Sequence, residues 1–95
     1  MSNLRYKSAT ADSLVVRGPC KYYGYIVNVA LSAAVCDIRD GVAAGGGNVV
    51  DTVAASSAAG TRGLLLHPVQ FNNGLFIDFA GTGTITVLYE GDFNA

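Results

Sequence analysis

The sequence predicts an all-β protein, a small single-domain β-sandwich of jelly-roll-like type with about seven or eight strands. Strong helix formers are scarce, because the chain has one Glu, two Lys, one Gln and one Met. Val, Ile and Thr together number 21 and nine residues are aromatic, and these side chains suit a pleated sheet. Twelve glycines interrupt the chain at short intervals, as many tight turns require. These three observations favour strands joined by turns over helices.

The length of 95 residues corresponds to one domain. Leu, Ile, Val and Phe make up 27 of those residues, which is enough for a hydrophobic core. Only 14% of residues are charged, against about 25% in ordinary soluble domains. The net charge of −1 provides no electrostatic footprint for nucleic acid or for an anionic membrane surface. A surface with so few charges suits a protein whose surface is partly buried against binding partners.

The sequence also predicts a soluble protein that is made in a cytoplasm. The first ten residues are polar and lack the apolar region of a secretory signal. The most apolar stretch, residues 24–38, is shorter than the roughly 20 residues that a spanning helix needs. Cys20 and Cys36 lie in no metal-binding or redox motif, so we expect two free thiols and no intrachain disulfide.

The first half of the chain is divided into a polar arm and four strands. Residues 1–11 lack turn or strand periodicity and are predicted to form an N-terminal arm, followed by the sandwich domain over residues 12–95. The first strand covers residues 14–17 and ends at a Gly-Pro pair, and a long central strand covers residues 20–30. Residues 34–39 alternate with Ala34, Cys36 and Ile38 inward, and residues 48–54 alternate again.

The second half is predicted to contain three further strands joined by glycine turns. A strand over residues 63–71 contains Pro68, which favours an edge position or a bulge. The Asn-Asn-Gly sequence at 72–74 is the strongest hairpin signal in the chain and predicts that this strand pairs with residues 75–79. A Gly-Thr-Gly turn then leads into the last strand, residues 84–89.

No motif predicts catalysis, a cofactor or a metal. The Gly-Thr-Gly at 81–83 lacks the third glycine of a nucleotide-binding loop and precedes a strand, and the triple glycine at 45–47 lacks the Gly-Lys-Ser/Thr of a phosphate cradle. His67 is the only histidine and has no partners at metal-ligand spacing, so we expect a partly exposed structural residue. Ser56 and Ser57 lack the surroundings of a nucleophile elbow. We therefore predict no catalytic, cofactor-binding or metal-binding residues, no small-molecule substrate, and no enzyme.

Two groups of aromatic and apolar residues are candidates for a partner interface. Tyr22, Tyr23 and Tyr25 place rings on both faces of one predicted strand, so at least one should point outward. Exposed tyrosine is favoured at protein interfaces. The alternative is that two belong to the core and the third covers a strand edge. Leu4 and Tyr6 are the apolar residues of the arm, and we expect them to anchor it against a neighbouring subunit or the capsid. The predicted interface residues are Leu4, Tyr6, Tyr22 and Tyr25.

Three segments resemble small virion proteins of tailed bacteriophages. Residues 14–29 read LVVRGPCKYYGYIVNV and are similar to the opening of those chains. Residues 37–41, DIRDG, fit the short strand that follows in them. Residues 71–90, FNNGLFIDFAGTGTITVLYE, resemble their closing segment. The resemblance covers about residues 12–91 and rests on turn residues and alternation rather than on functional residues.

This resemblance implies a β-sandwich structural protein, of the capsid decoration (cement) type, on the exterior of the virion. Its expected partners are the major capsid protein and copies of itself, in a small homo-oligomer. A neck or tail component is the alternative within the same class. A host-surface or carbohydrate-binding module is the alternative from another class, because sandwiches often serve that role.

Overall fold

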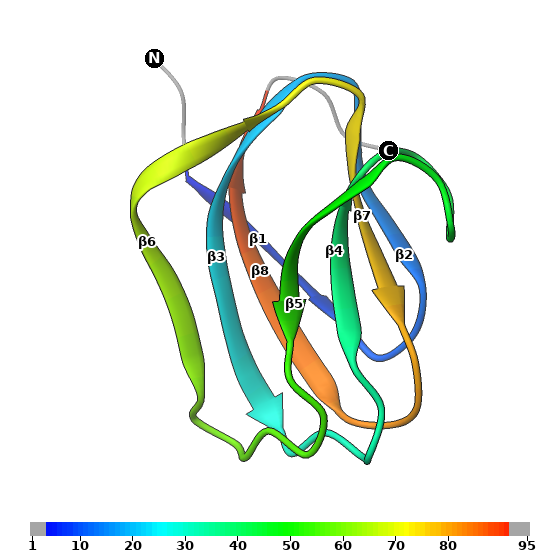
Figure 1. The fold of residues 1–95 in the computed structure, drawn as a ribbon. Coiled ribbons are helices and arrows are strands. Elements are labelled where there is room, and N and C mark those ends of the chain that lie inside the picture. The colour runs from blue at the N-terminus through cyan, green and yellow to red at the C-terminus, as the bar shows by residue number, and fades with distance from the viewer. Residues whose placement is uncertain (1–3, 92–95) are drawn as a thin grey trace.

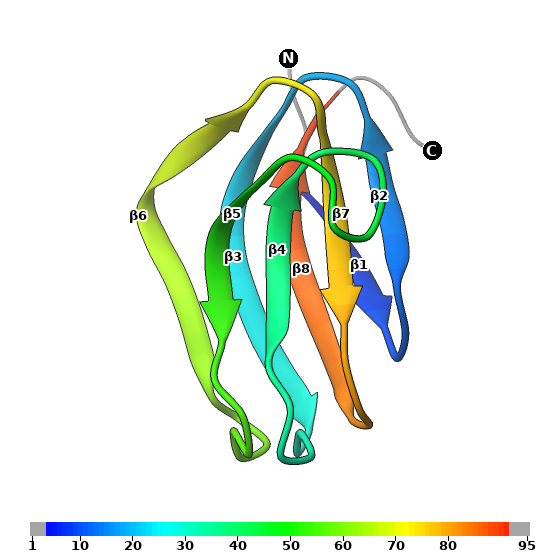
Figure 2. The same cartoon turned by 45° about the vertical axis from the view of Figure 1, so that its right-hand side comes forward.

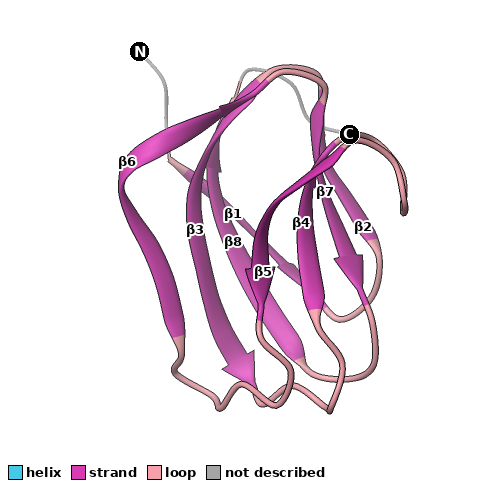
Figure 3. Cartoon of the chain, in the orientation of Figure 1, coloured by secondary structure: helices cyan, strands magenta, loops and turns pink. Residues whose placement is uncertain are grey.

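The computed structural model describes residues 4–91, which form eight strands and no helix (Figures 1 and 3). The strands lie in two antiparallel four-stranded sheets that face each other. Sheet A has the order β1-β8-β3-β6, and sheet B has the order β2-β7-β4-β5. The strands are β1 (Arg5–Ala9), β2 (Ser13–Arg17), β3 (Cys20–Val29), β4 (Cys36–Asp40), β5 (Asn48–Val53), β6 (Arg62–Phe71), β7 (Gly74–Phe79) and β8 (Thr84–Glu90).

Successive strands alternate between the two sheets, which confirms the predicted all-β sandwich. Only β4 and β5 are both neighbours in sequence and paired in one sheet (Figure 2). Every other connection in the described chain crosses from one sheet to the other. This arrangement of eight strands in two sheets is that of a jelly roll. Seven of the eight strands, β2 to β8, lie within a few residues of those that the alternation pattern predicts.

The core lies between the sheets and consists of the inward side chains of all eight strands and the loop after β3. It is aliphatic on most strands, with a tilted contact between the rings of Tyr22 and Phe71, whose centroids are 5.4 Å apart. Its buried members are Ala9, Val15, Val16, Cys20, Tyr22, Val27, Leu31, Cys36, Ile38, Val53, Phe71, Leu75, Ile77, Phe79, Ile85, Val87 and Tyr89. Cys36 and Ile38 point inward as the alternation predicts.

The predicted N-terminal arm is wrong for residues 5–9, because they form β1 at the edge of sheet A. All five residues pair with β8, from Arg5 opposite Tyr89 to Ala9 opposite Ile85. Only Ala9 is buried, so the strand lacks the inward apolar residues that reveal a strand in the sequence. The boundary predicted between the arm and the sandwich therefore falls inside the sandwich, and residues 1–3 lie outside the described part.

The predicted hairpin at residues 72–74 is also wrong, because β6 and β7 belong to different sheets. The segment is a corner between the sheets, and its geometry is fixed by the carboxylate of Asp40 at the end of β4. That carboxylate accepts hydrogen bonds from the backbone N–H groups of Asn72, Asn73 and Gly74, at 2.8 Å for Asn73. Gly74 is needed for space, since a Cβ there would lie 2.7 Å from the carbonyl oxygen of Gly41 and 2.8 Å from that of Val16.

Irregular pairing on β3 changes which of its residues face the core. Simple alternation predicts Tyr22 and Val27 on opposite faces, yet both are fully buried. The register of β3 shifts between Tyr22 and Gly24 on both sides, against β6 and against β8. A β-bulge adds one residue to a strand and so exchanges the two faces beyond it.

Both cysteines are free and buried, Cys20 on sheet A and Cys36 on sheet B, in agreement with the predicted absence of a disulfide. Burial raises the pKa of Cys20 to about 11 and that of Cys36 to about 12. The negative charges of Asp40 and Asp37, respectively, act in the same direction.

We expect neither thiol of the folded protein to react with a disulfide reagent at about pH 8, and both to react after unfolding, because the attacking species is the thiolate. Because the folded pKa values exceed the ordinary 9.0, the contribution of each thiol to the free energy of unfolding is intact below about pH 9 and is lost as the pH rises through about 11 for Cys20 and about 12 for Cys36. Thiol titration and denaturation at several pH values measure these effects. Rapid labelling of the folded chain at about pH 8 would show that the thiols are accessible.

Candidate interaction surface

An apolar row crosses the outer face of sheet A from one edge to the other. Tyr6 on β1 lies opposite Leu88 on β8, Leu88 lies opposite Gly24 on β3, and Gly24 lies opposite Leu64 on β6. Directly paired residues point to the same face of a sheet. That face is the outer one, because Val87 and Tyr89, the sequence neighbours of Leu88, are buried in the core.

Further apolar side chains flank this row. Ile26 pairs with Thr86 and therefore shares the outer face, while Tyr23 donates a hydrogen bond from its hydroxyl to Glu90 Oε1 at 3.3 Å. Leu4 precedes β1 and is 58% exposed. We refer to the set as the sheet A face, and its apolar members are Leu4, Tyr6, Tyr23, Ile26, Leu64 and Leu88.

The polar groups near the centre of the sheet A face bond to one another. The hydroxyl of Thr86 donates to Asn28 Oδ1 at 2.6 Å and shares a 2.7 Å hydrogen bond with the hydroxyl of Ser8. Thr86 is thereby nearly buried, at 9% exposure. A partner could cover the two hydroxyls and the Asn28 amide oxygen without leaving any of these three groups unpaired, which limits the desolvation cost of binding.

The outer face of sheet B is different, because charged residues occupy its middle. Asp37 and Asp78 are direct cross-strand neighbours on β4 and β7. Arg39 Nε donates to Asp78 Oδ2 at 2.8 Å, and a second guanidinium nitrogen of Arg39 lies 4.0 Å from Asp37 Oδ2. Thr52 also donates to Asp37, at 3.0 Å. Of the two outer faces, only that of sheet A has an uncharged centre.

A second apolar feature is the irregular middle of β6. The register runs from Leu64 opposite Gly24 to Val69 opposite Tyr22, so four residues of β6 lie opposite the single residue Tyr23. Leu65 turns inward and packs against the core, while Leu66 is 91% exposed. We call residues 65–68 the β6 bulge. The bulge and the edge position of β6 agree with the prediction that Pro68 makes.

The bulge also carries His67, which is exposed. Its exposure agrees with the expectation of a histidine that is at least partly exposed. Within residues 4–91, no three His, Cys, Asp or Glu side chains are grouped so that they could hold a metal ion. Ser57, in the loop before β6, donates its hydroxyl to the carbonyl of Ala54 at 2.6 Å, an ordinary turn contact.

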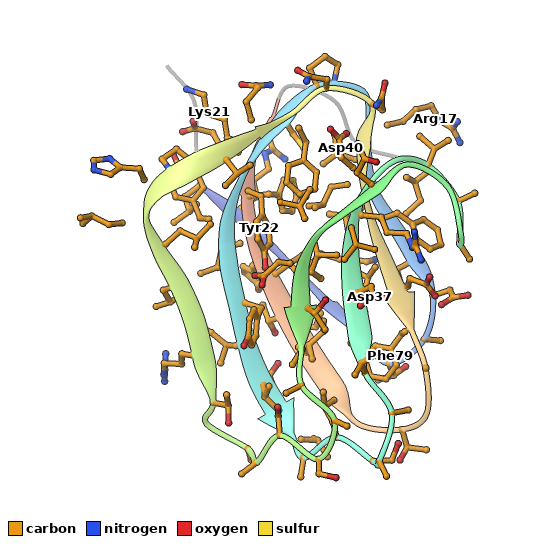
Figure 4. The ribbon with its side chains drawn as sticks, viewed as in Figure 1. Arg17, Lys21, Tyr22, Asp37, Asp40 and Phe79 are labelled. Carbon is orange, nitrogen blue, oxygen red and sulfur yellow. The ribbon has the colours of Figure 1, made fainter. Side chains whose placement is uncertain are left out.

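Two of the four predicted interface residues lie on the sheet A face, and two do not. Tyr6 is 73% exposed, and Leu4, two residues before it in the chain, is 58% exposed. Tyr22 is wrong as an interface residue, because it is fully buried and its hydroxyl donates to Asp51 Oδ2 at 2.8 Å, between β3 and β5 (Figure 4). Burial, and then the charge of Asp51, raise the pKa of the Tyr22 phenol far above its ordinary value. Tyr25 is half-buried and packs against the core, over Gly63.

The surface residues that sequence reasoning missed are Leu64, Leu66 and Leu88. The run Leu64-Leu65-Leu66 before a His-Pro pair contained a usable signal, since three consecutive leucines cannot all face the core of a sandwich. Leu88 fits the alternation of β8 as an outward residue. Its significance depends on Tyr6 and Leu64 beside it, and that proximity arises only from the strand order.

Comparisons with known proteins gave no match, either to a protein-family model, to a curated protein or to a solved structure. No helix in the described part of the chain is long and apolar enough to cross a membrane.

Proposed function

We propose that this chain is a structural protein of a bacteriophage virion, a capsid decoration protein that binds the outside of the assembled shell and stabilises it. The observation that carries the proposal is the β6 bulge, which presents Leu66 to solvent at 91% exposure. Its neighbour Leu65 packs against the core and holds the bulge in place. The sequence resemblance over residues 14–29, 37–41 and 71–90 supports the same class of protein.

In this proposal the bulge inserts Leu66 into an apolar depression of the capsid protein. The cost of ordering a loop on binding is small where the loop is already anchored. Each copy adds a modest contact, and many copies around a symmetric shell add up to a large stabilisation of the particle. The low charge of the chain is consistent with a surface that is covered in its working state.

The number of copies in purified virions tests the proposal and separates it from its alternatives. Quantitative mass spectrometry should find the chain at hundreds of copies, in a fixed ratio to the major capsid protein. A few copies per particle would indicate a neck or tail component, and absence from the particle would contradict a virion role. Binding of the isolated chain to a glycan array, without incorporation into particles, would favour the carbohydrate-binding alternative.

A mutation in the bulge tests the contact itself. We expect Leu66→Asp to reduce occupancy on the capsid at least tenfold while changing stability by less than about 0.5 kcal/mol, because an exposed side chain contributes little to folding. Val42→Asp, at a 43% exposed position in the loop between β4 and β5, is the matched control and should keep normal occupancy. Occupancy measured by sedimentation with capsids decides between them. Equal occupancy of both variants would exclude the bulge as the contact.

A further inference from the structure

We infer that the sheet A face binds the sheet A face of a second copy of this chain, so that the protein is a face-to-face dimer. The inference goes beyond the proposed function, because it concerns the isolated chain and a different surface from the β6 bulge. The juxtaposition that carries it is the row of Tyr6, Leu88 and Leu64 across a sheet face with no charged side chain at its centre.

The composition of the face is that of an interface centre with a polar rim. Its middle holds Leu88, Ile26 and the hydrogen-bonded Thr86, and no charged residue. The charged residues that the pairing places on this face are at strand ends, Lys21 opposite Glu90 and Arg62 opposite Ile26. Interface centres are depleted in charge and enriched in aromatic residues, as this face is with Tyr6 and Tyr23.

Charge favours a second copy as the occupant. Lys21 and Glu90 at one end of the face are direct cross-strand partners, so their charges offset each other. Arg62 at the other end lies on the edge strand β6. A face with so little net charge can approach its own copy without like-charge repulsion. The outer face of sheet B is less suited to such a contact, because Asp37, Asp78 and Arg39 at its centre would all have to be desolvated.

The size of the face also fits a dimer. The strands of sheet A have 5, 7, 10 and 10 residues. With a rise of about 3.4 Å per residue and a spacing of about 4.8 Å between strands, their flat footprint is about 520 Å². The accessible area of a face covered by side chains exceeds its flat footprint, which brings it to the lower end of the about 600–1,000 Å² that stable interfaces bury on each partner. Two such faces can stack as the sheets inside a sandwich do.

Sedimentation velocity on the purified full chain tests the inference. We expect the wild type to sediment as a dimer, at twice the 9.8 kDa of one chain. Tyr6→Glu and Leu64→Glu should each weaken dimerisation at least tenfold, because each places a charge in the interface. Both positions are exposed in one copy, at 73% and 52%, so the monomer should keep its fold by circular dichroism.

Val50→Glu is the matched control, an exposed aliphatic residue on the edge strand of the other sheet. It should leave the dimer intact. A wild-type chain that is monomeric at about 100 µM overturns the inference. So does an assembly that survives both Tyr6→Glu and Leu64→Glu, or one that dissociates equally with Val50→Glu. Because none of these measurements involves a capsid, their failure would leave the proposed function standing, and failure of capsid binding would leave the dimer standing.

Discussion

Replacing Asp40 with Ala is expected to lower the free energy of unfolding by about 3 kcal/mol, one of the largest effects of any single side chain outside the core. The carboxylate accepts hydrogen bonds from three backbone N–H groups at the corner between β6 and β7. Figure 4 labels the position of Asp40. Hydrogen bonds to a charged group contribute about 1.5–3 kcal/mol each at most, and here all three N–H groups would lose their acceptor together. Chemical denaturation measures the change.

Asp12 supplies the matched control for this prediction. Its carboxylate accepts a single backbone hydrogen bond, from the N–H of Phe79 at 2.7 Å. Asp12→Ala should therefore cost about 1 kcal/mol. Asp40→Asn keeps one acceptor oxygen and should fall between the two alanine variants. If Asp40→Ala is no more damaging than Asp12→Ala, the corner is held by other contacts.

Gly24→Ala is expected to destabilise the protein by about 3 kcal/mol or more. Gly24 lies where the register of β3 shifts, and its φ of +124° is one that residues with a side chain rarely adopt. A Cβ there would also lie 2.2 Å from the carbonyl oxygen of Gly63 and 2.8 Å from the Cα of Leu64. Both atoms belong to the backbone of the paired strand, so the clash can be relieved only if the strands separate.

Gly60→Ala separates the two causes of this loss. Gly60 also has a positive φ, of +92°, but nothing lies within 4 Å of a Cβ built there. Its replacement should cost about 1 kcal/mol, from the backbone conformation alone. Thermal unfolding of the two variants gives the comparison. Equal losses would mean that the close approach of β3 and β6 does not constrain Gly24.

Alternation and turn residues predicted the sandwich because most strands have one buried and one exposed face. On β4, for example, Cys36 and Ile38 are buried while the residues between and after them are not. The same reasoning failed for β1, which is an edge strand with both faces largely exposed. It gave the wrong face for part of β3, because a bulge near Tyr22 depends on how two neighbouring strands pair.

The predictions of the hairpin and of the interaction surface failed for a common physical reason. An Asn-Gly pair is a local signal, whereas the sheet that each strand joins is decided by contacts far along the chain. The carboxylate of Asp40, more than thirty residues earlier, turns that pair into a corner between sheets. Likewise Tyr6 and Leu64 lie in one row only because β8 and β3 separate their strands. Local patterns contain no information on that order.

Sedimentation of the purified chain with capsids that lack it tests the proposed binding to the capsid exterior. We expect saturable binding, at a fixed number of copies per capsid protein. We also expect Leu66→Asp to bind at least tenfold less and Val42→Asp to bind normally. A wild-type chain that stays in the supernatant at every capsid concentration would contradict the proposal.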